Sequence, residues 1–175
     1  MEYPLFTPPA PLFEKSHFEW TLKEARAYFD WFLKQLEPRT GFLLQYLDEQ
    51  DQSNAPALLS GVGEKVAALV RQEPFSTPAG ARRELTNRGY ALAADTGLLL
   101  ARSVLRDNPA ARWEILRKPK REMSFHLPVL VGVGPVHVDP IGATVANFHA
   151  MLRGEKGPSF LPNGYALCLE GAKPQ

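Results

Sequence analysis

The 175-residue sequence is poor in the features that usually assign a chain to a class of protein. Cys168 is its only cysteine, which excludes an intramolecular disulfide and any metal site built from several thiolates. The net charge is +1, which argues against binding nucleic acid through overall charge. No apolar run reaches the roughly 18 to 20 residues of a membrane span, and prolines interrupt the N-terminus where a secretory signal would be apolar. We therefore expect a cytoplasmic protein that binds no membrane.

Motifs for catalysis and cofactor binding are also missing. The sequence contains no Gly-x-Ser-x-Gly elbow, no His-Glu-x-x-His pair and no complete phosphate-binding loop. His137, Asp139 and His149 have a spacing that a metal site could use. Asp139 followed by Pro140, however, is the pattern of a helix start, so a capping role is sufficient for that carboxylate. We predict a protein that is not an enzyme and that binds no metal and no cofactor.

What is present indicates one globular domain covering residues 1–175. Apolar residues make up 45% of the chain and charged residues 22%, which is ordinary for a soluble domain of this length. The 16 prolines cluster, and four of them lie within residues 3–13 among aromatic and aliphatic side chains. Because proline disfavours helix, residues 1–18 are predicted to form an extended arm packed on the body.

The first two thirds of the chain predict helices. Residues 87–107, with Asn87 as N-cap, are apolar nearly all round, which is typical of a long, buried central helix. Three shorter helices are predicted before it, over residues 22–36, 39–49 and 62–72. The first begins at a Thr21–Glu24 capping box and is expected to end before Pro38.

Beyond residue 109 the pattern favours strands. They are predicted at 111–116, 123–127 and 128–133, with 136–138 continuing or pairing with the last, and at 165–169. A helix is predicted from Asp139 to Gly154. Helices followed by a small antiparallel sheet of about three to four strands and a C-terminal helix indicate an α+β fold.

One acid interrupts the predicted central helix. A buried Asp95 must be paired, hydrogen-bonded or protonated, and functional sites collect such groups. Arg102 lies on the same helix edge, although two turns away. A structural role is the favoured interpretation, and a small enzyme with a polar cleft around Asp95 and Arg102 is the alternative.

Charges of opposite sign gather in two places. Residues 1–60 carry nine acids and five bases, whereas residues 111–175 carry five acids and eight bases. The acidic cluster is Asp48, Glu49 and Asp51, and the basic cluster is Arg117, Lys118, Lys120 and Arg121 on a predicted hairpin. The basic hairpin raises the alternative of a module that contacts nucleic acid, against which the near-neutral net charge argues.

Two tryptophans mark a second apolar side of the first helical segment. Trp20 and Trp31 project away from the stripe that contains Phe29, and large aromatics on an outer face mark either burial or a protein-binding surface. The favoured interpretation is that the proline-rich arm covers them. The alternative is a surface for a partner protein or for a second copy of the chain.

Two parts of the chain resemble small bacterial proteins. The segment 19–32, closed by Pro38-Arg39, is similar to openings of small, uncharacterised bacterial proteins. The run from Gly89 to Leu105, followed by the segments 111–114, 128–130 and 138–140, resembles helix, hairpin and helix domains among immunity proteins of bacterial polymorphic toxin systems.

The resemblance implies a cytoplasmic α+β protein that binds and neutralises a cognate toxin domain without a cofactor. A non-enzymatic immunity protein is therefore the leading functional hypothesis. If the toxin is a nuclease with a basic cleft, then Asp48, Glu49 and Asp51 would complement its charge. Trp20 and Trp31 are the other candidate contacts.

Overall fold

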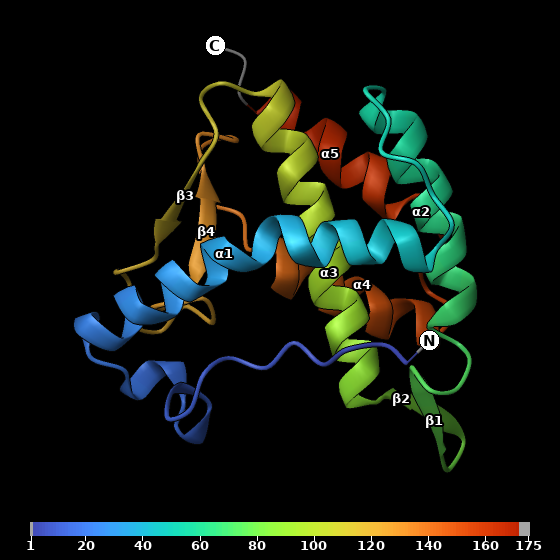
Figure 1. The fold of residues 1–175 in the computed structure, drawn as a ribbon, viewed down its shortest axis with the longest axis horizontal. Coiled ribbons are helices and arrows are strands. Elements are labelled where there is room, and N and C mark those ends of the chain that lie inside the picture. The colour runs from blue at the N-terminus through green and yellow to red at the C-terminus, as the bar shows by residue number, and fades with distance from the viewer. Residues whose placement is uncertain (1, 172–175) are drawn as a thin grey trace.

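A computed structural model describes residues 2–171, with Phe13 described by its backbone only (Figure 1). The helices are α1 (Leu22–Tyr46), α2 (Ala55–Leu69), α3 (Asn87–Asp107), α4 (Pro140–Leu152) and α5 (Phe160–Glu170), preceded by the short 3-10 helices η1 (Leu12–Glu14) and η2 (His17–Glu19). The strands are β1 (Ser76–Ala79), β2 (Arg82–Leu85), β3 (Arg112–Ile115) and β4 (Pro128–Val131). This architecture confirms the predicted α+β class. The strands form two antiparallel pairs, β1–β2 and β3–β4, so each sheet is smaller than the three to four strands predicted.

The centre of the fold is α3, as the sequence predicts. Every residue from Ala91 to Ala101 is buried, and α1, α4 and α5 all contact this helix. Figure 1 shows α1 crossing α3. A Cβ at Gly97 would lie 2.6 Å from the carbonyl oxygen of Pro140, so this glycine permits the close approach of α4. The N-cap is Thr86, whose side chain accepts a hydrogen bond from the Gly89 amide, rather than the predicted Asn87.

Pro38 does not end α1, which corrects the two helices predicted over 22–36 and 39–49. The helix runs without a break from Leu22 to Tyr46. A proline inside a helix removes one amide donor and so leaves the carbonyl four residues earlier without its partner. That carbonyl belongs to Lys34, and both Lys34 and Pro38 are exposed, so water can hydrate it. Buried Phe32 and Leu43 hold the two halves of the helix on the core.

Other predictions fail where short apolar runs are ambiguous between helix and strand. Residues 165–169 belong to α5, because Leu161, Tyr165 and Cys168 are buried at helical spacing. Residues 123–127 are turns in the connection between β3 and β4, not a strand. The helix predicted at 62–72 begins earlier, where the Asn54 side chain caps α2. The β1–β2 hairpin was not predicted.

The segment before η1 runs in an extended conformation over α1 and α3 (Figure 1). Tyr3 is buried, and its ring contacts Phe42, Tyr46 and Phe75 edge-on at centroid distances of 4.9 to 5.4 Å. Further along, Phe6 lies 5.2 Å from the Trp31 ring. This N-terminal arm (residues 2–11) is thus part of the core on its apolar side. The extended conformation predicted for residues 1–18 does not continue to residue 18, because the 3-10 helices η1 and η2 follow the arm.

Candidate functional site

Asp95 lies at the centre of a buried ion pair. Its carboxylate accepts hydrogen bonds from Arg39 Nε at 2.6 Å, from Arg39 Nη2 at 2.8 Å and from the Tyr3 hydroxyl at 2.6 Å. Arg39 also donates to the carbonyl oxygens of Pro4 and Leu5, each at 3.1 Å. The pair therefore connects α1, α3 and the N-terminal arm.

Burial dominates the electrostatics of this pair. The Asp95 side chain is wholly inaccessible to solvent, and desolvation raises the pKa of its carboxyl to about 6, against the opposing effect of the hydrogen bonds from Arg39 and Tyr3. Burial and the neighbouring carboxylate also raise the pKa of the Tyr3 hydroxyl far above its usual range. Tyr3 therefore acts as a hydrogen-bond donor at every physiological pH.

The alternative of a small enzyme required Arg102 and Asp95 to share a polar cleft. The structure does not bring the two side chains together. The Arg102 guanidinium donates to Asp51 at 2.9 Å and to Glu37 at 3.4 Å on the surface. The partner of Asp95 is Arg39, which the sequence reasoning did not single out. No local signal could have found it, because 56 residues separate the two side chains.

The acidic cluster predicted as a partner-binding site is largely paired within the chain. Glu49 forms an ion pair with Lys65 at 2.9 Å, and Asp51 contacts Arg102. The same Lys65 ammonium donates to the main-chain oxygens of Leu47 and Asp48 at the end of α1. These cations offset the unfavourable placement of acids at a helix C-terminus.

His137, Asp139 and His149, whose spacing a metal site could use, do not form a group of possible ligands among the described residues. Asp139 caps α4 by accepting from the Gly142 amide at 2.9 Å, and its other oxygen accepts from the Ser124 hydroxyl at 2.8 Å. His149 lies beside the Tyr90 hydroxyl, 3.4 Å away. Within residues 2–171, no three His, Cys, Asp or Glu side chains form a group that could hold a metal ion.

The two tryptophans differ in exposure. Trp20 is 7% exposed, and its indole Nε1 donates to the carbonyl oxygen of Leu12 at 3.2 Å. Trp31 is half-buried between Phe6 of the arm and Tyr28 of α1. Segments of the same chain therefore cover most of the apolar side that these residues mark.

The basic cluster lies on the connection between β3 and β4. All four of its members, Arg117, Lys118, Lys120 and Arg121, are exposed, and none forms an ion pair with another residue of the described range 2–171. The connection is anchored where it leaves and re-enters the sheet, because the His126 amide donates to Leu116 and the Leu116 amide donates to Leu127. The four cations thus lie on a connection whose two ends are held by backbone hydrogen bonds.

Exposed apolar side chains flank these cations. Met123 is 75% exposed, although its carbonyl oxygen lies 2.8 Å from His17 Nε2. Phe18 is 41% exposed and stacks on Phe125 at a centroid distance of 6.5 Å. We call the set formed by Phe18, Arg117, Lys118, Lys120, Arg121 and Met123 the basic loop surface. The sequence showed its charges, but Met123 lies in a segment predicted to be a strand, and Phe18 reaches this surface from a distant part of the chain.

A hollow of about 590 Å³ adjoins the basic loop surface. Phe29 and Trp113 form part of its apolar lining, and Arg117 and Lys118 lie at its charged side. The indole Nε1 of Trp113 is buried and has no hydrogen-bond partner among the described residues. The arrangement could accept an apolar side chain from a molecule that also presents negative charge.

Comparison with known proteins identifies no relative: no family model, curated protein or solved structure matches this chain. In the part of the chain that the structure describes, no helix has both the length and the apolar character needed to cross a membrane.

Proposed function

We propose that this chain is a non-enzymatic protein-binding protein, and specifically an immunity protein that binds and neutralises a cognate bacterial toxin in the cytoplasm. The basic loop surface carries the proposal. It combines an exposed methionine and an exposed phenylalanine with four exposed cations, and methionine, aromatic residues and arginine are enriched at protein interfaces. Because backbone hydrogen bonds anchor both ends of the loop, the loop loses less conformational entropy when it binds a partner.

The charge of the surface defines the partner. Arg117, Lys118, Lys120 and Arg121 would speed encounter with an acidic protein surface and fix its register. The cluster of Asp48, Glu49 and Asp51, which would suit a basic partner, is less available because Lys65 and Arg102 already pair with two of its members. We therefore propose an acidic contact region on the toxin, with an apolar side chain that enters the hollow beside Trp113.

The other two functional classes have less support. The bidentate contact from Arg39 to Asp95 favours a structural role for that carboxylate over a catalytic one. A nucleic-acid module would need more positive charge than a chain with a net charge of +1 carries, and the exposed Met123 supplies no contact to phosphate.

The test is co-expression and co-purification with the product of the neighbouring gene, which we expect to be a toxin, followed by titration with charge-reversal variants. The quadruple variant R117E/K118E/K120E/R121E should bind that protein about 10-fold or more weakly at low salt, because attraction becomes repulsion. The matched control K23E/R26E/K34E/K156E makes the same charge change at exposed cations outside ion pairs, and it should bind as the parent chain does.

Truncation tests the apolar part of the surface. Met123→Ala and Phe18→Ala should each weaken binding by about 5-fold or more, as interface anchors do. Leu167→Ala removes an exposed side chain from α5, outside the basic loop surface and its adjoining hollow, and should have no effect. Equal binding by the two quadruple variants would refute the proposed surface. Tight, steeply salt-dependent binding to duplex DNA of arbitrary sequence would instead establish the nucleic-acid function.

A further inference from the structure

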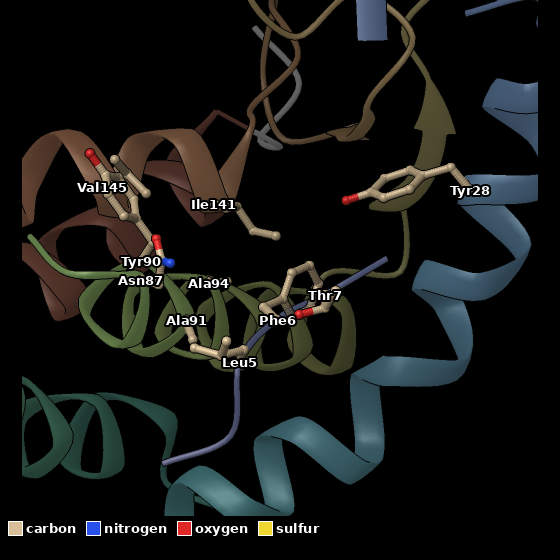
Figure 2. Close-up of a pocket in the computed structure, with 10 residues that line it drawn as sticks. All are labelled: Leu5, Phe6, Thr7, Tyr28, Asn87, Tyr90, Ala91, Ala94, Ile141 and Val145. Carbon is tan, nitrogen blue, oxygen red and sulfur yellow. The ribbon is translucent and has the colours of Figure 1, made fainter. Parts of the chain in front are cut away.

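A second cavity lies far from the basic loop in the sequence and is built from four parts of the chain. Its volume is about 390 Å³, within the range of small-molecule sites. Figure 2 shows the N-terminal arm, α1, α3 and α4 each contributing side chains to it. Most of the wall is apolar and consists of Leu5, Phe6, Ala91, Ala94, Ile141 and Val145.

One polar group points into this cavity without a partner. The Tyr28 side chain is 9% exposed, with its ring packed 4.9 Å from Trp20 and 5.4 Å from Trp31. In Figure 2 the Tyr28 side chain extends from α1 with its hydroxyl on the side facing Ile141, Phe6 and Thr7. Within residues 2–171 this hydroxyl makes no hydrogen bond, in contrast to the hydroxyls of Tyr3 and Tyr165. The hydroxyl is not one of the fully buried unpaired polar atoms, so it is accessible from the cavity, where a ligand atom can take the place of water.

The charge of Asp139, which acts on the Tyr28 hydroxyl, restricts the ligands that suit the cavity. Burial, and to a smaller extent the charge of Asp139, raise the pKa of the Tyr28 hydroxyl above its usual range, so the group stays protonated and can donate. Asp139 itself is already engaged by Gly142 and Ser124. No lysine, arginine, aspartate or glutamate lines the cavity. A carboxylate ligand would therefore meet a nearby negative charge and no cation.

We propose that this cavity binds a neutral, mostly apolar small molecule whose carbonyl oxygen accepts a hydrogen bond from the Tyr28 hydroxyl. The apolar wall holds the body of the molecule, and the Tyr28 hydroxyl fixes its orientation. Asn87 and Thr7 supply further polar groups in the lining. The site is independent of the basic loop surface, and neither proposal requires the other.

The N-terminal arm forms one wall of the site, and its position depends on the buried ion pair. Arg39 holds the carbonyl oxygens of Pro4 and Leu5, directly before the lining residues Phe6 and Thr7. A bound molecule would contact both the arm and α3. Binding should therefore protect the amides of the arm segment from hydrogen exchange.

Three probes of similar shape test the chemistry: acetophenone, ethylbenzene and benzoate. Each is titrated into the full chain, and binding is followed through the NMR amide shifts of Phe6 and Ala94. Acetophenone should bind about 2- to 10-fold more tightly than ethylbenzene, which is the usual net effect of one neutral hydrogen bond. Benzoate should bind most weakly of the three. Absence of binding by all three would mean that the cavity holds water only, and would overturn the proposal.

Variants identify the donor. Tyr28→Phe should remove the preference for acetophenone over ethylbenzene and leave the urea midpoint unchanged, because the hydroxyl has no partner to lose. Tyr165→Phe is the matched control, since that hydroxyl bonds Asp107 away from the cavity, and it should bind the probes as the parent does. A preference for acetophenone that survives Tyr28→Phe would refute the assignment, as would a marked loss of stability in that variant.

Discussion

Replacement of Arg39 by leucine tests the claim that the buried ion pair holds the arm and two helices together. The substitution leaves the Asp95 carboxylate wholly buried with one donor, the Tyr3 hydroxyl at 2.6 Å. It also frees the carbonyl oxygens of Pro4 and Leu5. Removing one partner of a buried pair typically costs about 3–5 kcal/mol, because the remaining charge is left uncompensated in a low-dielectric interior.

The free energy of unfolding is measured by urea denaturation at pH 7.5, above the raised pKa of Asp95. Far-UV circular dichroism reports on the helices, and tryptophan fluorescence reports on the region where Trp20 and Trp31 lie. We expect Arg39→Leu to lose about 4 kcal/mol. Arg102→Leu is the control, because the acids paired with Arg102 are exposed at the surface and such pairs contribute about 0–1 kcal/mol.

A double replacement distinguishes the cost of an unpaired charge from the value of the pair itself. Arg39→Met combined with Asp95→Leu removes both charges and keeps apolar volume in the core, so it should recover most of the stability lost by Arg39→Leu. A loss below about 1 kcal/mol for Arg39→Leu, equal to that of the surface control, would refute the reasoning.

Two further predictions concern pH and packing. Burial raises the pKa of Asp95 from an ordinary 3.8 to about 6, so the folded state keeps a proton that the unfolded chain has already released. The stabilisation that this group gives to the fold is therefore full below pH 4 and is lost as the pH rises through 6. The urea midpoint should fall over this range, and Asp95→Asn should abolish that fall. Gly97→Ala would bring a Cβ to 2.6 Å from the Pro140 carbonyl oxygen and should destabilise the fold by about 1–3 kcal/mol in thermal unfolding. Gly41→Ala, at an exposed helical position with no atom within 4 Å, should instead stabilise it by about 0.5–1 kcal/mol. A normal melting temperature for Gly97→Ala would contradict the close approach of α4 to α3.

Local signals in the sequence were sufficient for the elements that are strongly periodic. Residues 87–107 and the helix that follows Asp139 were predicted near their observed bounds, because apolar stripes and caps act over a few residues. The same local logic failed at Pro38, where packing on both sides of the proline outweighs one lost hydrogen bond. It failed again at residues 165–169, since a five-residue apolar run fits a strand or a helix equally well.

The candidate sites show the same difference between what local sequence predicts and what it cannot predict. The sequence by itself determined that Asp95 needs a partner and that four cations gather at 117–121, because burial and charge can be read from neighbouring residues. Only the tertiary structure decided that the partner is Arg39, that Glu49 and Asp51 pair with Lys65 and Arg102, and that Tyr28 faces a cavity. Each of these contacts joins segments distant in the chain, and their meeting depends on how the helices pack rather than on any local pattern.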